Sequence, residues 1–263
     1  MSSRELPLPT FLIIGAQKCA TRWLRFNLGL HPDVYAASTE LSFFNNGHRI
    51  RNLEIVGYRE QFEGWAGEPI VGEATPGYMF WKHHPDRCSK RMHKVVPKAR
   101  LIAILRNPID RAQSAMRHHI ASGALPPKSD LVKLVRRTKP ERDRLGLISG
   151  GWYAASLEPY LEAFGDQLLV VFQEDIDNDA RAFYRRAADH IGATREFVPP
   201  DLEEVRFSYA QRPGFDTDRI SPLTYKQRRK LYKYFADDIA KLEKMLGRDL
   251  SSWRPVKPAP GED

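Results

Sequence analysis

Residues 11–24, FLIIGAQKCATRWL, combine a tight turn with a cation and a hydroxyl in a pattern that suits anion binding. Four apolar residues lead into Gly15, a short polar loop follows, and an amphipathic run begins at Thr21, which predicts strand, turn and helix. Main-chain N–H groups of such a turn and the positive end of the helix dipole bind anions, and Lys18 adds a charge. The loop lacks the Gly-Lys-Ser/Thr ending of a Walker A motif. The alternative is an ordinary turn with a solvated lysine.

A second segment, residues 100–119, places an arginine where a buried strand is expected to end. Its apolar run stops at Arg106, and Asn107-Pro108 then suits the first turn of a helix. Ser114 follows two turns into that helix, and Arg106 and Ser114 are spaced to converge on one phosphate, a group that arginine binds well. The alternative is an ion pair between Arg106 and Asp110.

Short apolar runs alternate with helical patterns along the chain, which predicts an α/β fold with a parallel, doubly wound sheet. Such a sheet gathers ligands at the carboxyl ends of its strands, where both segments lie. We expect one domain over residues 1–263, with its core at about 10–253. The expected strands are Phe11–Ile14, Ile70–Gly72, Leu101–Leu105 and Leu168–Phe172, and the expected helices are Thr21–Leu30, Pro85–Val96, Ile109–Ser122, Tyr153–Phe164, Ala180–Ile191 and Leu223–Leu246.

Two further regions give weaker patterns. Residues 124–148 are polar and basic and contain three prolines, which predicts a mobile excursion with one short helix. The last expected helix carries an apolar stripe that we assign to the core, made of Leu231, Phe235, Ile239, Leu242 and Leu246.

Composition limits the class of protein. The chain has 263 residues, 42% of them hydrophobic, and no apolar run approaches the length of a membrane span. Its N-terminus lacks the pattern of a signal peptide, so we expect a cytoplasmic protein. The two cysteines, Cys19 and Cys88, predict free thiols. The formal charge of +8 favours anionic partners, namely nucleotides, nucleic acid or acidic membrane surfaces, without choosing among them.

Together, GAQKCATRWL and LRNPIDRAQSAMRHH resemble the motifs of the PAPS-dependent sulfotransferase family, where PAPS is 3′-phosphoadenosine 5′-phosphosulfate. The resemblance implies a P-loop-NTPase-like sulfotransferase fold and a sulfuryl transfer that needs no metal and leaves 3′-phosphoadenosine 5′-phosphate (PAP). By the same resemblance, Arg106 and Ser114 hold the 3′-phosphate. The residues implied at the 5′ end are Gly15, Ala16, Gln17, Lys18, Cys19, Ala20, Thr21, Arg22 and Trp23.

Two more segments resemble the glycosaminoglycan (heparan-type) and bacterial branch of that family. HPDVYAASTELSFFN, residues 31–45, implies that Glu40 is the general base, with a solvated residue capping a turn as the alternative. GEATPGYMF, residues 72–80, looks like the acceptor-side segment and implies acceptor contacts by Glu73, Thr75 and Tyr78. His118 matches a position near the active site, and a surface or core histidine is an equal alternative.

The chain departs from the family pattern in the nucleotide motifs. Ala20 stands where glycine is usual before Thr21, which tightens access to the phosphate. The lysine-rich C-terminal loop that closes over the cofactor has no clear match, and Arg206 and Arg212 are its candidates.

Departures on the acceptor side predict a less charged acceptor. Thr39, Ser42 and Ala74 occupy positions that are basic or histidine in the glycosaminoglycan-type pattern. A sulfated polyanion would lose attraction there, so we expect a small glycan, a glycolipid headgroup or a phenolic metabolite. Residues that could stack on a sugar or aryl face, some of them core instead, are Phe43, Phe44, Tyr78, Met79 and Phe80.

Two other functions stay open from the sequence. A P-loop-like kinase is disfavoured by the missing Gly-Lys-Ser/Thr ending and the lack of an obvious Mg²⁺-binding Asp. A non-catalytic nucleotide- or nucleic-acid-binding protein is favoured only by the basic charge, since no RNA- or DNA-binding motif is present, and we expect no nucleic-acid partner. The group His83, His84, Cys88 and His93 fits no strong zinc signature, so no metal site is predicted.

Overall fold

The computed structural model describes residues 5–45, 55–80, 84–138, 142–194, 196–204 and 221–257. The chain divides into two compact units. The first consists of Met1–Leu105 and Glu158–Arg206, and the second of Arg106–Leu157 and Phe207–Asp263. The expectation of one domain over the whole chain stays a prediction.

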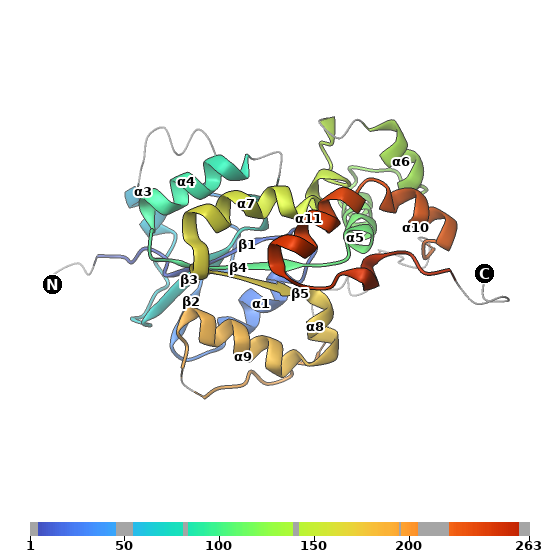
Figure 1. Cartoon of the computed structure of the whole chain (residues 1–263). Coiled ribbons are helices and arrows are strands. Elements are labelled where there is room, and N and C mark those ends of the chain that lie inside the picture. The colour runs from blue at the N-terminus through green and yellow to red at the C-terminus, as the bar shows by residue number, and fades with distance from the viewer. Residues whose placement is uncertain are drawn as a thin grey trace. The chain divides into compact units, whose positions relative to one another are not determined.

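The first unit is built on a parallel sheet of five strands in the order β2-β3-β1-β4-β5 (Figure 1). Its central strand, β1, pairs with β3 on one side and β4 on the other, and all of its residues are buried. Such a strand is covered on both faces, which explains its unbroken apolar sequence. The α/β fold with a parallel sheet is thereby confirmed. The strands are β1 (Phe11–Gly15), β2 (Val34–Ala36), β3 (Ile70–Ala74), β4 (Arg100–Leu105) and β5 (Leu168–Phe172).

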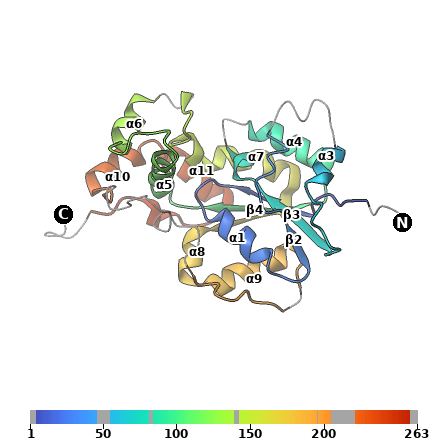
Figure 2. The same cartoon turned by 180° about the vertical axis from the view of Figure 1, so that it is seen from behind.

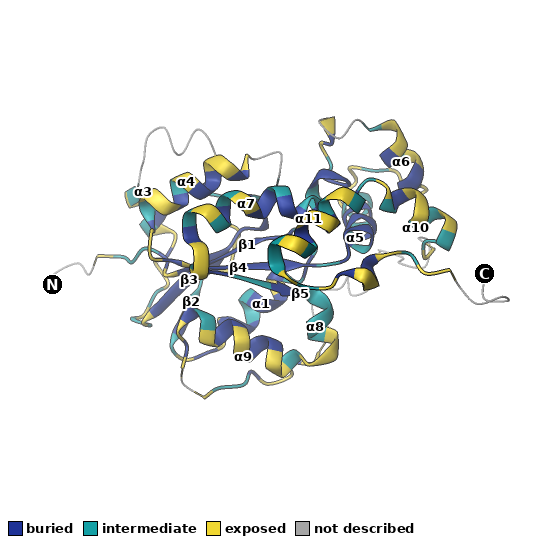
Figure 3. Ribbon diagram, in the orientation of Figure 1, coloured by how far each residue is buried: buried dark blue, intermediate teal, exposed yellow. Residues whose placement is uncertain are grey.

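Helices cover both faces of this sheet, as Figures 1 and 2 show from opposite sides. One face carries α1 (Thr21–Leu28), α8 (Gln173–Asn178) and α9 (Ala180–Ile191). The other carries α3 (Ile55–Glu60), α4 (Pro85–Val95) and the part of α7 (Tyr153–Phe164) that belongs to this unit. Figure 3 shows buried central strands beneath helices that expose one side, which is the amphipathic arrangement that the sequence periodicity predicts. No helix in the described ranges is long and apolar enough to cross a membrane.

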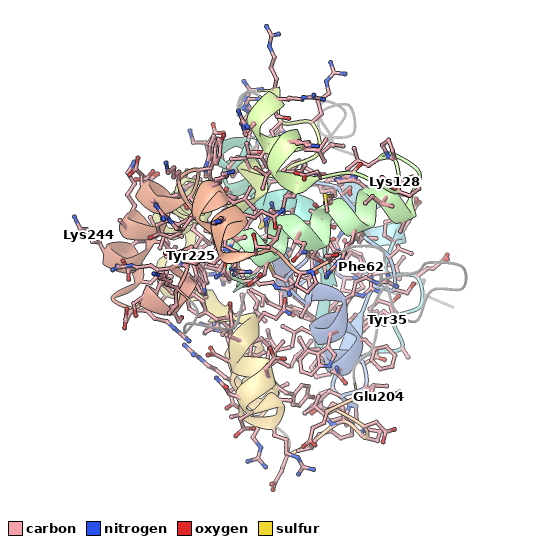
Figure 4. The ribbon with its side chains drawn as sticks, turned by 90° about the vertical axis from the view of Figure 1, so that its right-hand side faces the viewer. Tyr35, Phe62, Lys128, Glu204, Tyr225 and Lys244 are labelled. Carbon is pink, nitrogen blue, oxygen red and sulfur yellow. The ribbon has the colours of Figure 1, made fainter. Side chains whose placement is uncertain are left out.

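The sequence did not predict β2, α3 or α8, because each is short. β2 has three residues at the sheet edge, too few for an apolar run to be recognised. Its Tyr35 ring lies against Phe62, with 6.4 Å between ring centroids (Figure 4). α3 and α8 have six residues each, which is shorter than sequence periodicity can establish.

The second unit includes α5 (Pro108–Ala121), α6 (Leu131–Arg137), α10 (Tyr225–Tyr232) and α11 (Ala236–Leu246). Arg111, on α5, is fully buried and donates to the carbonyls of Gly146 and Leu147, at 2.7 and 2.8 Å. These charge-assisted bonds fix the chain after α6 against α5. The short helix expected within 124–148 is α6.

The single C-terminal helix expected over Leu223–Leu246 is wrong, since two helices occupy this range (Figure 4 labels Tyr225 on α10 and Lys244 on α11). A capping box at Thr224 starts the first, and a turn at Phe235 precedes the second. Asp238, in the first turn of α11, accepts the N–H groups of Ala154 and Ala155 at 3.0 and 3.2 Å. The apolar stripe is buried on both sides of the break, at Leu231, Phe235, Ile239 and Leu242. The apolar pattern of the sequence therefore gives no sign that the helix is interrupted.

The turn from β1 to α1 uses left-handed backbone at non-glycine residues. Lys18 has φ 72°, and Ala20, the residue before α1, has φ 59°. A residue with a Cβ pays about 1–2 kcal/mol in this region. The geometry explains why the family pattern has glycine at the position of Ala20.

We therefore expect Ala20→Gly to raise the free energy of unfolding by about 1 kcal/mol, because glycine adopts this backbone without a Cβ clash. Ala182 is exposed on α9 in the same unit, and there the same substitution should lower stability by about 0.5–1 kcal/mol. Urea unfolding of both variants measures the difference. Equal destabilisation by the two substitutions would contradict the assignment of strain to Ala20.

Candidate active site

The turn after β1 brings together the residues that the first motif singled out. Gly15 ends β1 so close to Met79 that an added Cβ would lie 2.7 Å from its sulfur, and this approach requires glycine. The Ala16 N–H donates to the Ile104 carbonyl at 2.8 Å, which ties the start of the loop to β4. In the rest of the turn Ala16, Cys19, Thr21 and Trp23 are buried, Gln17, Lys18 and Ala20 are half-buried, and Arg22 is exposed.

The first turn of α1 has the features of an anion site. Main-chain N–H groups at the start of a helix have no carbonyl acceptor within that helix, and Ala20 offers no side chain to cap them. This turn also contains no acidic residue, while Lys18 precedes it and Arg22 lies within it. These features suit a phosphate group, and the binding of one stays a prediction.

Glu40 lies within the electrostatic field of three cations in the first unit. Neighbouring atoms displace water from its carboxyl, and this desolvation raises the pKa. The charges of Arg25, Arg22 and Lys18 lower the pKa in turn, and the net pKa lies above the ordinary value. The residue itself is exposed, so the carboxylate is open to a proton donor from solution. This combination of accessibility and nearby cations suits a general base.

Arg25 was missed by the sequence reasoning, although its charge acts on Glu40 more strongly than that of Lys18 or Arg22. It is half-buried, and burial together with the charge of Arg22 lowers its own pKa. The available signal was the three-residue spacing from Arg22, which places both side chains on one face of α1.

Glu73, Thr75 and Tyr78, the predicted acceptor contacts, form one buried hydrogen-bonded cluster with Tyr58. The Tyr58 and Tyr78 hydroxyls donate to Glu73 Oε1 at 2.8 and 2.7 Å, and the Thr75 hydroxyl donates to Oε2 at 2.6 Å. All four side chains are at most 1% exposed. Burial raises the pKa of Glu73, and these hydrogen bonds lower it again, with a net pKa above the ordinary value. Contact of these residues with an acceptor stays a prediction.

In the second unit, Arg106 stands immediately before the helix that carries Ser114. Asn107 caps α5 by accepting the Ile109 N–H at 3.0 Å, and Tyr153 donates to the Arg106 carbonyl at 2.9 Å, which fixes this backbone. Asp110, the alternative ion-pair partner for Arg106, accepts two hydrogen bonds from Arg228 at 2.6 and 3.2 Å.

Arg117 is a second cation near Arg106 that the sequence reasoning missed. Burial, and then the charge of Arg106, lowers the pKa of Arg117, while the charge of Asp110 raises it, so Arg117 lies within the electrostatic field of Arg106. Arg117 follows Ser114 by three residues, a spacing that places both on one helix face. His118 is half-buried, and its ring contacts that of His119 with 5.3 Å between centroids. The catalytic role of His118 stays a prediction.

Several other expectations now have a location. Phe43, Phe44, Tyr78 and Met79 are buried in the core, whereas Phe80 is half-buried. Arg206 and Arg212 lie outside the described residues. Cys19 and Cys88 are buried thiols that take part in no disulfide, and a thiol state is what the sequence predicted for both.

Each unit, taken by itself, offers donors that suit a phosphate group. The first unit has a helix start, Lys18 and Arg22, and the second has Arg106 and Arg117 on and before α5. Cations and main-chain N–H groups are the donors that bind phosphate oxygens.

Comparison with known proteins identifies the family. The family model described as a sulfotransferase domain matches residues 8–243. The heparan sulfate glucosamine 3-O-sulfotransferase 3B1 of Mus musculus is 30% identical over 79% of this chain and 51% of its own length. The bifunctional heparan sulfate N-deacetylase/N-sulfotransferase 4 of Mus musculus is 26% identical over 94% of this chain and 31% of its own length. The chain thus spans from about a third to about half of the length of these curated relatives.

Solved structures agree with this family. A sulfotransferase from Alicyclobacillus acidocaldarius is 28% identical, with a TM-score of 0.73 over 94% of this chain and 99% of that one. Mouse sulfotransferase SULT7A1, solved in complex with PAP, is 15% identical with a TM-score of 0.51 over 91% of this chain and 89% of that one, which shows the fold alone. With the sheet, the turn after β1 and the family match in agreement, the chain belongs to the PAPS-dependent sulfotransferase family.

Proposed function

We propose that this protein transfers the sulfuryl group of PAPS to a hydroxyl or amine of an acceptor by in-line displacement. The observation that carries the proposal is the placement of Glu40, an accessible carboxylate, within the field of Lys18 at the anion-binding turn. A proton acceptor and a phosphate-binding cation in one unit are the two groups that sulfuryl transfer needs from the protein.

Each group has one task in this mechanism. When bound, PAPS supplies an activated sulfuryl group attached to a phosphate leaving group. Glu40 takes the proton of the acceptor hydroxyl or amine, which requires its carboxylate form. Lys18 and the main-chain N–H groups of the turn stabilise the negative charge that grows on the 5′-phosphate.

The second unit supplies the residues that we assign to the 3′-phosphate. Arg106 and Ser114 come from the motif, and the nearby cation Arg117 joins them as a proposed ligand. Binding energy at this remote phosphate aligns the reacting group without taking part in the chemistry. His118, on the same helix, is retained as a second candidate for proton transfer.

For the acceptor we propose an uncharged or weakly charged molecule, either a glycan, a glycolipid headgroup or a phenol. Thr39 and Ser42, on either side of Glu40, are exposed and half-buried, so uncharged side chains flank the proposed base. Fewer cations there reduce the attraction for a sulfated polymer.

A transfer assay with labelled PAPS and a panel of acceptors tests this function. We expect turnover of neutral glycans or phenols and weak turnover of heparin-like chains. Glu40→Gln should lower kcat by about a hundredfold or more, because the general base is lost, whereas Glu63→Gln, at an exposed glutamate of the same unit, should leave it unchanged. Turnover confined to heparin-like chains would overturn the acceptor proposal. Transfer of phosphate from ATP in place of sulfate would favour a kinase.

In this mechanism Arg25 affects the pH at which kcat falls on the acid side, because its charge acts on the pKa of Glu40. Its charge lowers the pKa of Glu40, so Arg25→Gln should raise that pKa further. Since the carboxylate is the active form, the acid limb of kcat should move toward higher pH, with kcat above the limb within about twofold of wild type. Arg87→Gln, at an exposed arginine on α4, is the matched control. An acid limb that stays in place in Arg25→Gln would contradict this role.

A further inference from the structure

Glu73 is connected to the chain after Glu40 by two hydroxyl relays. The Ser42 N–H donates to the Thr75 hydroxyl at 3.2 Å, and that hydroxyl donates to Glu73 at 2.6 Å. The Phe43 N–H donates to the Tyr78 hydroxyl at 3.1 Å, and that hydroxyl donates to Glu73 at 2.7 Å. Each hydroxyl accepts a hydrogen bond from a main-chain N–H and donates one to the Glu73 carboxylate. It is therefore used both as an acceptor and as a donor.

The Leu41 N–H completes the set, because it donates directly to the Glu73 carboxylate. Three consecutive N–H groups are therefore connected to one buried carboxyl group, that of Leu41 directly and those of Ser42 and Phe43 through a hydroxyl. Ser42 adopts φ 52°, a left-handed conformation that needs support from its surroundings. Glu40 immediately precedes this segment and is exposed.

We propose that Glu73 is a positioning residue, which acts through Thr75 and Tyr78 to hold the main chain at 41–43 and so place the Glu40 carboxylate for proton transfer. This inference rests on the proposed function of Glu40. In this inference Glu73, Thr75 and Tyr78, which the sequence predicted as acceptor contacts, act indirectly: they position the base and do not contact the acceptor.

Tyr58 provides an internal comparison for this role. Its hydroxyl donates to the same Glu73 oxygen as that of Tyr78, at 2.8 against 2.7 Å, and the two side chains are 1% and 0% exposed. Among the described contacts, the Tyr78 hydroxyl accepts a main-chain N–H of the 41–43 segment and the Tyr58 hydroxyl does not. Tyr→Phe at either position removes one buried hydrogen bond, and only the change at Tyr78 breaks a relay.

The test compares Tyr78→Phe with Tyr58→Phe in the full chain, with transfer kinetics, PAP affinity, urea unfolding and amide exchange at Phe43. We expect Tyr78→Phe to lower kcat by about tenfold or more with little change in the acceptor KM, because a misplaced base slows the step without weakening binding. Its Phe43 amide should exchange about tenfold faster. Tyr58→Phe should keep kcat within about threefold and leave Phe43 protected, although both variants lose similar stability.

The outcomes separate this inference from the proposed function. Equal losses of kcat in the two variants, with Phe43 protected in both, would overturn the positioning role and leave Glu73 as a core carboxylate. A raised acceptor KM with unchanged kcat in Tyr78→Phe would indicate direct acceptor contact, which also overturns it. If wild type transfers no sulfate or Glu40→Gln is fully active, the function itself fails. The Phe43 exchange measurement still decides whether the relay holds the segment.

Discussion

The central position of β1 in the parallel sheet is the constraint on which the rest of the site depends. Because β1 pairs in parallel with β3, the carboxyl ends of the two strands lie at one edge of the sheet. The Thr75 N–H donates to the Ile13 carbonyl at 3.0 Å, and the Met79 side chain packs on Gly15, so a main-chain hydrogen bond and close packing hold the turns after both strands together. These contacts thus fix the turn after β1 to the segment that follows Glu73.

Two glutamates in this unit have raised pKa values and opposite surroundings. Glu73 is fully buried and is stabilised by hydroxyl and N–H donors, which leave its oxygens occupied. Glu40 is exposed and is stabilised by the charges of Arg25, Arg22 and Lys18, which leave its oxygens accessible to a reactant. Different environments can give two carboxyl groups separate tasks, and here they suggest one that holds the chain and one that accepts a proton.

The sequence predicted the elements whose signal is local and missed what depends on tertiary contacts. Unbroken apolar runs at Phe11–Ile14 and Leu101–Leu105 identified β1 and β4, each to within one residue, whereas the edge strand Val34–Ala36 is too short to be recognised. The break at Phe235 was missed because the apolar stripe continues across it. In the site, the motifs singled out Lys18 and Arg106, but Arg25 could be connected to Glu40 only through the folded chain. The contact of Tyr58 with Glu73 likewise joins two elements that no spacing relates.

Calorimetric titration with PAP, with AMP and ATP as controls, tests the central claim most directly, because the 3′-phosphate distinguishes a sulfotransferase nucleotide from other adenine nucleotides. The account predicts that the wild-type protein binds PAP much more tightly than AMP or ATP. It also predicts that Arg106→Ala removes this preference, while Arg136→Ala, at an exposed arginine on α6, retains it. Equal binding of PAP and AMP by the wild-type protein, or tighter binding of ATP, would contradict the account.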